Sequence, residues 1–258
     1  MAAVRISEQL QRLVPQLRYE PTSKRLRARL GDEPVLDSRR AVLVWEPGKR
    51  HAAYAVPEDD VVASLEPNLV ENVEGRVGSE RHTADGELLA VGVGPTEPRA
   101  SLPGAAYRLS DRDLPGYIVF DMDPFDWFEE DEPVIGPPRD PFHRIDIRAS
   151  SRHVRVLLDG VVLADTTRSV LMFEGQLPPR TYIPREDVHW DRLEPVGLVT
   201  VCQYKGHAHY WEAPGLGDGR PVAWSYGPEF PEMAQIHGLV AFYDERTHIE
   251  VDGEKSVT

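Results

Sequence analysis

Several polar residues that can bind or transform a small molecule lie close together in the second half of the chain. Arg185 and Glu186 follow a proline, and Cys202, Tyr204 and Lys205 lie almost next to one another. Arginine and lysine bind anionic groups, tyrosine and glutamate can transfer a proton, and cysteine can be a nucleophile. We therefore predict that Lys205, Arg185, Tyr204 and Glu186 form the catalytic part of a site for an anionic or carbonyl metabolite.

Aromatic residues flank these polar residues in the sequence. Rings bury much of the surface of a small ligand while a few polar groups orient it, so a ligand pocket is one explanation of the pattern. The other explanation is the hydrophobic core of a β domain, and alternation along strands divides the rings between two faces. The residues that we expect to contact a ligand are Tyr182, Cys202, Tyr210, Trp224 and Tyr226.

Each polar candidate also has a purely structural interpretation. Lys205 is either a solvated turn lysine or an anion-binding group, and it would form a Schiff base only if desolvation favoured its neutral form. Cys202 is either an inert core residue or a nucleophile activated by the charge of Lys205 or Arg185. Arg185, Glu186 and Asp187 are either a strand-end turn that pairs its own charges, or an arginine clamp beside a carboxylate base.

Metal chemistry is not predicted. His207 and His209 alternate on one strand face and could join Cys202 around a metal, but no fourth ligand has suitable spacing. Asp121 and Asp123 superficially offer the carboxylates of a two-metal site. No phosphate-binding loop accompanies them, so we interpret them as a solvated strand end. The sequence therefore predicts neither a metal nor a cofactor.

The chain also contains two stretches that read almost alike. Residues 24–46 align without a gap with residues 152–174, and the same offset matches Tyr54 with Tyr182. A period of this length is too long for a solenoid repeat and suits a duplicated small domain, so we predict two copies of one fold. Only the second copy has the arginine at position 185 and the cysteine and lysine of the segment 202–226.

Short strands are the elements that must position the candidate residues. Runs of β-branched and aromatic residues alternate with turn residues, and 23 prolines and 20 glycines argue against long helices or a parallel sheet. We predict an antiparallel all-β protein with one N-terminal helix that packs on the repeat. Its parts are the helix in 1–22, a divergent first repeat in 23–132, a Pro-rich linker in 133–142, and a second repeat in 143–258.

The motifs of the second copy resemble the family called domain of unknown function 427. They are Tyr-Ile-Pro-Arg-Glu-Asp at 182–187, Cys-x-Tyr-Lys-Gly at 202–206, Ala-Trp-Ser-Tyr at 223–226 and Ile-x-Gly-Leu-Val-Ala-Phe-Tyr at 236–243. The resemblance covers the second copy well and the first weakly, in a tandem arrangement like that of actinobacterial members. It implies a pseudo-barrel or tent-like fold related to methionine sulfoxide reductase B. The chain departs from the family at Gln203, where proline is usual, and its first copy lacks the Cys-x-Tyr-Lys-Gly element.

Charge and hydropathy limit the classes of function. The 258-residue chain carries a net charge of −14, which disfavours nucleic acid or an anionic membrane as the main partner. It has neither a long apolar run nor a signal peptide, so we expect a cytoplasmic protein. A single cysteine excludes an internal disulfide. We expect a monomer with internal pseudo-symmetry.

These observations predict a small-molecule pocket in the second copy and leave open whether the protein is an enzyme. One alternative is a non-catalytic binding or scaffold module that uses the groove between the two copies. Another is nucleotidyl transfer, which a label sometimes attached to the family suggests.

Overall fold

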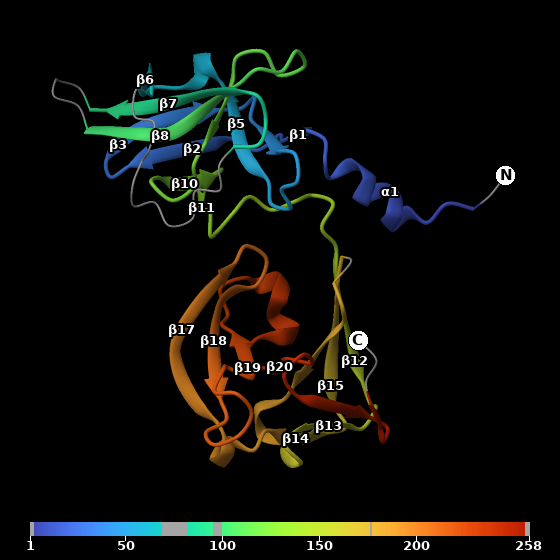
Figure 1. Cartoon of the computed structure of the whole chain (residues 1–258). Coiled ribbons are helices and arrows are strands. Elements are labelled where there is room, and N and C mark those ends of the chain that lie inside the picture. The colour runs from blue at the N-terminus through green and yellow to red at the C-terminus, as the bar shows by residue number, and fades with distance from the viewer. Residues whose placement is uncertain (1–2, 69–81, 95–99, 176, 256–258) are drawn as a thin grey trace. The chain divides into compact units, whose positions relative to one another are not determined.

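The computed structural model describes residues 3–68, 82–94, 100–175 and 177–255 (Figure 1). The chain divides into two compact units, Met1–Asp140 (unit 1) and Pro141–Thr258 (unit 2). The boundary lies within the Pro-rich segment 133–142. Antiparallel strands dominate both units, which confirms the all-β prediction.

Unit 1 contains a seven-stranded sheet in the order β1-β4-β5-β9-β8-β7-β6 and a four-stranded sheet in the order β11-β10-β2-β3. Its elements are α1 (Ile6–Leu13), β1 (Arg18–Pro21), β2 (Leu26–Leu30), β3 (Glu33–Ser38), β4 (Val42–Trp45), β5 (Ala53–Pro57), η1 (Glu58–Asp60), β6 (Ser64–Pro67), β7 (Gly86–Val93), β8 (Ala100–Leu109), β9 (Tyr117–Phe120), β10 (Asp126–Glu129) and β11 (Glu132–Pro133).

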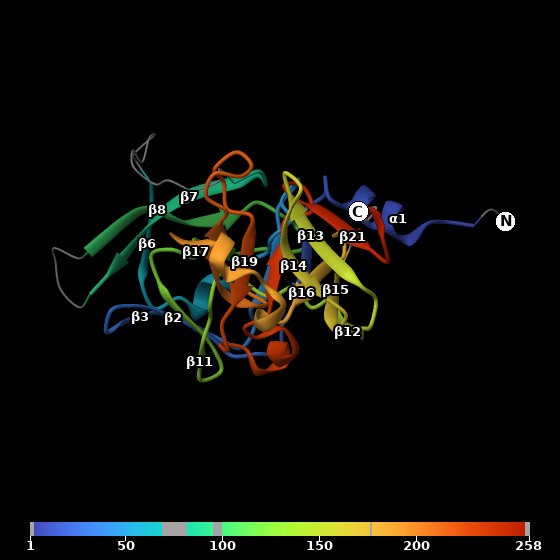
Figure 2. The same cartoon turned by 90° about the horizontal axis from the view of Figure 1, so that it is seen from below.

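Unit 2 repeats this topology strand for strand, with sheet orders β12-β15-β16-β20-β19-β18-β17 and β14-β13-β21-β22. Its elements are β12 (Ile145–Ser150), β13 (Val154–Leu158), β14 (Val161–Thr166), β15 (Ser169–Glu174), β16 (Arg180–Ile183), η2 (Arg185–Asp187), η3 (Trp190–Arg192), β17 (Glu194–Cys202), β18 (Gly206–Glu212), β19 (Ala223–Tyr226), η4 (Pro231–Ile236), β20 (Val240–Phe242), β21 (His248–Val251) and β22 (Glu254–Lys255). Figure 2 shows β13, β14 and β21 in front of the larger sheet of this unit.

The predicted Asp-Gly hairpin joins β13 to β14. Asp159 and Gly160 have φ angles of 50° and 80°, and this pair of positive values is what a tight two-residue hairpin of the primed type requires. Gly31, with a φ angle of 59°, lies in the corresponding turn between β2 and β3. Both turns are therefore set by local sequence.

Each seven-stranded sheet has two differently packed faces. One face packs on the four-stranded sheet, and in unit 2 this core contains Val154 and Leu163 from the small sheet and Ile183 and Phe242 from the large one. The opposite face carries a second cluster, which in unit 2 is rich in rings and is covered in part by Ile236 of η4. In Figure 1 the large sheet of unit 2 curls around this second face, as a tent-like domain does.

The strand register corrects one detail of the predicted repeat. Val42 pairs with Ala55, whereas the aligned Val170 pairs with Tyr182. Tyr182 therefore corresponds to Ala55 and not to Tyr54. Because side chains alternate along a strand, this slip of one residue places Tyr54 in the core between the sheets and Tyr182 on the opposite face.

The N-terminal helix is shorter than predicted and none of its residues is buried. It ends at Leu13, just before Pro15, as that proline suggested, and the segment from Arg18 onward forms β1 beside β4. The expected packing of the helix on the repeat is therefore wrong, since Ile6, Leu10 and Leu13 are all exposed. Among the described residues, no helix is long and apolar enough to cross a membrane.

Candidate functional site

A hydroxyl, a carboxylate and an arginine make the same contacts in both units. In unit 2, Thr166 Oγ1 donates to Asp187 at 2.6 Å, and Arg168 donates to the same carboxylate at 2.8 Å. The hydrogen bond from Arg168 holds the pKa of Asp187 below its usual value. The exposed Glu186 also pairs with Arg168, at 3.2 Å. The equivalent residues of unit 1 are Ser38, Asp60 and Arg40. Because the arrangement occurs twice, it belongs to the fold.

A buried glutamate at the end of β15 organises a polar cluster, which we call the Glu174 cluster. Lys205 Nζ donates to both carboxylate oxygens of Glu174 at 2.6 Å, and His143 Nε2 lies 3.0 Å from Oε1. The ring of Tyr204 stacks on His143 with centroids 4.3 Å apart. Burial acts to raise the pKa of Glu174, but Lys205 and His143 outweigh it and hold that pKa below its usual value. The glutamate is therefore ionised and engages the ammonium of Lys205.

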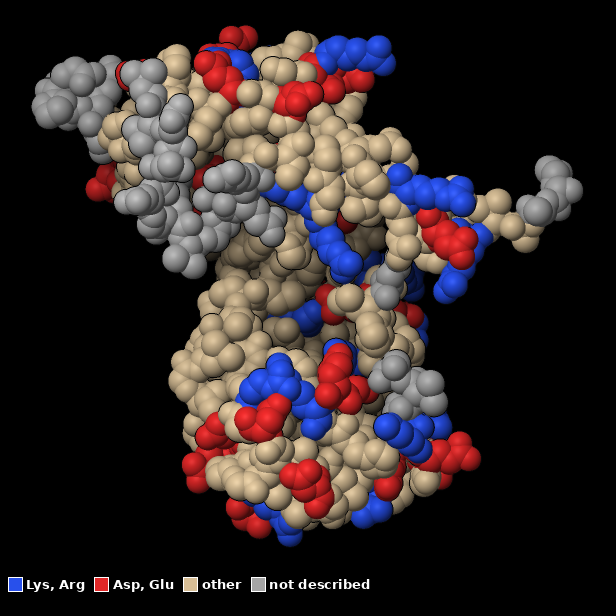
Figure 3. All heavy atoms as spheres, in the orientation of Figure 1, with Lys and Arg blue, Asp and Glu red and all other residues tan. Residues whose placement is uncertain are grey.

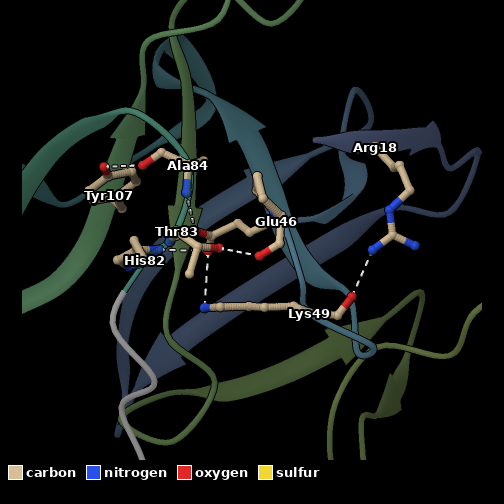
Figure 4. Close-up of polar contacts among 8 residues, drawn as sticks. Arg18, Glu46, Lys49, His82, Thr83, Ala84 and Tyr107 are labelled. Carbon is tan, nitrogen blue, oxygen red and sulfur yellow. Dashed lines mark hydrogen bonds and ion pairs between the residues drawn. The ribbon is translucent and has the colours of Figure 1, made fainter. Parts of the chain in front are cut away.

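Unit 1 holds a buried glutamate at the same position of the repeat (Figure 4). Glu46 accepts hydrogen bonds from the backbone N–H groups of Thr83 at 2.6 Å and Ala84 at 3.1 Å, and lies 2.8 Å from His82 Nδ1. Lys49 Nζ approaches it at 3.3 Å. Burial acts to raise the pKa of Glu46, yet His82 and the two amides lower it to about 2. Groups of unit 1 therefore supply both hydrogen bonds and positive charge to this carboxylate.

The two glutamates differ in how they are neutralised. The strand pairs match Glu87 of β7 with His209 of β18. Four positions earlier in each unit, Thr83 therefore corresponds to Lys205. Unit 1 therefore uses peptide N–H groups where unit 2 uses a lysine side chain. A buried carboxylate at the end of this strand is a property of both copies, and Lys205 supplies its counter-charge in unit 2.

Aromatic candidates form a row across the second face of the unit 2 sheet, which we call the aromatic row. Tyr182 and Trp224 both pair with Ala241, and Trp224 pairs with Tyr210. The hydroxyl of Tyr182 is buried and makes no hydrogen bond to any described residue. Burial raises the pKa of this hydroxyl well above its usual value, and Trp224 acts in the opposite direction. The phenol of Tyr182 is therefore neutral.

A cavity of about 390 Å³ lies where β17, β18, β19 and η2 meet. Its polar lining consists of Arg185, His209 and Ser225. The other lining residues are Pro195, Val196, Tyr210, Trp211, Tyr226, Gly227 and Gly238. Pro195 and Trp211 lie on the face of the sheet that carries His209 and Ser225, whereas Val196, Tyr210 and Tyr226 pack in the cluster of the opposite face.

Two indole rings hold Arg185 at this cavity. Its guanidinium carbon lies 4.2 Å from the ring centroid of Trp190 and 5.6 Å from that of Trp211. Trp190 is fixed in turn, because its indole N–H donates to the Arg185 carbonyl at 2.7 Å. Within the described part of the chain the guanidinium makes no ion pair. Stacking orients the cation and leaves its N–H groups available.

In unit 1 the positions that correspond to Arg185 and its neighbours pair their charges with one another. Arg108 of β8 donates to Glu58 at 2.7 Å and to Glu87 at 2.6 Å. The strand register assigns the positions of Glu58, Arg108 and Glu87 to Arg185, Ser225 and His209 of unit 2. Unit 2 therefore has its arginine on η2 and has no carboxylate at the two neighbouring positions.

A family model supports the resemblance read from the motifs. Residues 146–253 match the model described as Domain of unknown function (DUF427). Unit 2 belongs to this family. A search of curated proteins found no match to the chain. The matched range contains the cavity and most of the Glu174 cluster, and it lies entirely within unit 2.

The structure divides the predicted site of the DUF427 unit among separate places. Arg185, Tyr210 and Tyr226 line the cavity. Lys205 and Tyr204 belong to the Glu174 cluster, and Tyr182 and Trp224 belong to the aromatic row. Tyr226 lines the cavity and also lies near the Glu174 cluster, because its ring centroid is 5.8 Å from Lys205 Nζ. Cys202 is a half-buried free thiol at the end of β17, and Glu186 is the exposed partner of Arg168.

Glu174, His143, Ser225 and Trp211 are the contributors that sequence reasoning missed. A signal for the first was present, because a glutamate ends the apolar strand in both copies of the gapless alignment. His143 lies outside the repeated segment and offered no signal. Within the described residues, no three His, Cys, Asp or Glu side chains are arranged to hold a metal ion.

Proposed function

We propose that the DUF427 unit binds a small organic carboxylate with an apolar or aromatic body in the cavity at Arg185. The guanidinium presents two parallel N–H groups that match the two oxygens of a carboxylate. Trp211 and Pro195, on the same face of the sheet as Arg185, would cover the body of the ligand, and Ser225 offers a further polar contact.

The proposal rests on the contacts of the Arg185 guanidinium. The residue is exposed, its cation is stacked on two indoles, and no carboxylate among the described residues pairs with it. In unit 1 the comparable arginine is balanced by Glu58 and Glu87. A ligand carboxylate would supply in unit 2 the counter-charge that the chain supplies in unit 1.

The cavity favours a carboxylate over a phosphate. Phosphate sites commonly combine several cations or a series of available backbone N–H groups. Here the N–H of Gly227 is directed to the His207 carbonyl at 3.4 Å, and that of Gly238 to the Tyr226 carbonyl at 3.0 Å. Pro195 has no N–H to offer. The recognition of negative charge therefore falls to Arg185.

Mass spectrometry of small molecules retained after native purification tests the proposal. The wild-type protein should retain a carboxylic acid that Arg185→Ala loses and that Arg185→Lys holds more weakly, because lysine lacks the planar fork. Arg220→Ala is the matched control, since Arg220 is exposed and pairs with the nearby Asp218. Retention of the same acids by wild type and Arg185→Ala would contradict the proposal.

A further inference from the structure

The last strand of the larger unit 2 sheet has an exposed apolar edge. β17 is a nine-residue strand at one end of the sheet order, so only β18 pairs with it. Leu198, Val199 and Val201 are 45%, 49% and 47% exposed. No charged residue occurs between Pro195 and Tyr204. Figure 3 shows an uncharged surface along the upper part of this flank of unit 2.

The other edge strands of the described sheets also carry charged side chains. Each carries at least one charged residue, for example Glu20 in β1, Asp37 in β3, Glu66 in β6, Asp146 in β12 and Asp165 in β14. Charged side chains on edge strands prevent unwanted pairing with other chains. In β17 the only charged residue is the first, Glu194. β17 therefore differs in the length of its uncharged run, because the eight residues 195–202 follow one another without a charge.

The second half of β17 is regular enough to pair on its open side. The register with β18 shifts between Val196 and Val199, and from Val199 to Cys202 the two strands pair without a break. Thr200 Oγ1 lies 2.7 Å from the Tyr210 hydroxyl, which turns Thr200 toward the second face of the sheet. Val199 and Val201 accordingly project from the opposite face.

We propose that β17 pairs in an antiparallel manner with β17 of a second copy of this chain, forming a two-fold symmetric dimer. Two identical antiparallel strands are self-complementary, and the pairing brings Val199 and Val201 of the two copies together as apolar cross-strand neighbours. A net charge of −14 opposes contact between most surfaces of two copies. β17 allows approach without opposing like charges. The dimer departs from the monomer expected from sequence.

Lysine substitutions on β17 test the association. Sedimentation velocity over a wide concentration range should show a dimer for the wild type and a monomer for Val199→Lys and Val201→Lys. Val62→Lys is the matched control, because Val62 is 61% exposed and lies outside the strands. Each lysine brings the net charge closer to zero, so a dimer governed by overall charge would be strengthened. A wild type that stays monomeric, or lysine variants that dimerise like it, would overturn the proposal.

Symmetry allows a second, independent test. A two-fold axis perpendicular to the paired strands places one residue of β17 directly opposite its own copy. In a Cys202→Ser background, single cysteines at Leu198, Val199, Thr200 and Val201 should therefore form an intermolecular disulfide efficiently at one position. Val62→Cys in the same background measures random collision. Cross-linking at no β17 position above that control would sink the proposal, and circular dichroism confirms that each variant is folded.

Discussion

At the scale of single residues, the most informative comparison is between the two buried glutamates. Glu46 and Glu174 end equivalent apolar strands, and each is ionised in a nearly dry environment. Taking a carboxylate out of water costs several kcal/mol, so each must be compensated where it stands. Unit 1 does so with two amides, His82 and Lys49, and unit 2 with Lys205 and His143. The lysine that sequence alone assigned to catalysis thus has a structural task.

Removing Lys205 should destabilise unit 2 strongly. The Lys205→Met variant leaves a buried carboxylate without its counter-charge, and breaking such a pair costs about 3–5 kcal/mol of unfolding free energy. Lys205→Met combined with Glu174→Leu should recover a large part of that loss, because the uncompensated charge is then gone. Urea unfolding of the single and double variants measures both effects. A loss of unfolding free energy below about 1 kcal/mol for Lys205→Met would contradict the structural role of Lys205.

The pH dependence of unit 1 should report on Glu46. The pKa of Glu46 is lowered to about 2 in the folded state from 4.5 in the unfolded chain, so the folded state binds fewer protons. The resulting stabilisation is complete above pH 4.5 and is lost as the pH falls toward 2. It amounts to about 3 kcal/mol.

Glu46→Gln should remove this part of the acid sensitivity. Unfolding of unit 1, followed by denaturant titration at several acidic pH values, should show a shallower loss of stability for the variant than for wild type. Glu66→Gln changes an exposed carboxyl of β6 and serves as the control. Parallel pH profiles for wild type and Glu46→Gln would refute the assignment.

At the scale of elements, the sequence predicted what depends on local chemistry. The Asp159-Gly160 hairpin, the antiparallel strands and the end of the helix before Pro15 follow from turn and strand propensities, and the structure has them. The face on which Tyr182 lies did not follow, because a slip of one residue between aligned copies reverses the faces. Nor could the partner of Lys205 be predicted, since Glu174 is 31 positions away on another strand.

Gly206 should be more sensitive to substitution than Gly160. Both have positive φ angles, 89° and 80°, so alanine strains the backbone at either position by about 1 kcal/mol. At Gly206 an added Cβ would also lie 2.7 Å from a carboxylate oxygen of Glu229, whereas at Gly160 it would meet nothing within 4 Å. Gly206→Ala must therefore displace Glu229 and disturb its 3.1 Å contact with His207.

Paired unfolding measurements separate the two costs at Gly206. The free energy of unfolding of Gly206→Ala should fall below that of Gly160→Ala by about 1 kcal/mol, as expected for a lost hydrogen bond. In a Glu229→Gly background, which removes the carboxylate and also the Glu229 Cβ that would lie 3.2 Å from the added Cβ, the two alanine variants should become equally destabilised. An equal effect in the wild-type background would show that backbone strain alone explains the glycine.

At the scale of the whole molecule, the two units share one strand topology but balance the charges on it in different ways. Every strand of unit 1 has a counterpart in unit 2, yet the residues around η1 and η2 differ. Arg185 of η2 stands where unit 1 has Glu58 of η1, and Ser225 and His209 stand where it has Arg108 and Glu87. Unit 1 pairs its arginine with two of its own carboxylates, whereas Arg185 of unit 2 has no ion-pair partner among the described residues. This contrast was visible in the sequence at position 185, but the neighbours that make it a cavity come from strands distant in the chain.

Rebuilding the unit 1 network in unit 2 tests that contrast directly. The triple variant Arg185→Glu, Ser225→Arg and His209→Glu places a glutamate, an arginine and a glutamate where unit 1 has Glu58, Arg108 and Glu87. The new arginine should pair with both carboxylates and fill the cavity, so the variant should fold and lose the carboxylic acid that the wild type retains. Thermal unfolding checks the fold, and mass spectrometry of retained small molecules checks binding. Ser225→Arg alone should be less stable than the triple variant, because its cation then lies beside Arg185 without a counter-charge. Retention of the same acid by the triple variant would show that the ligand is held elsewhere.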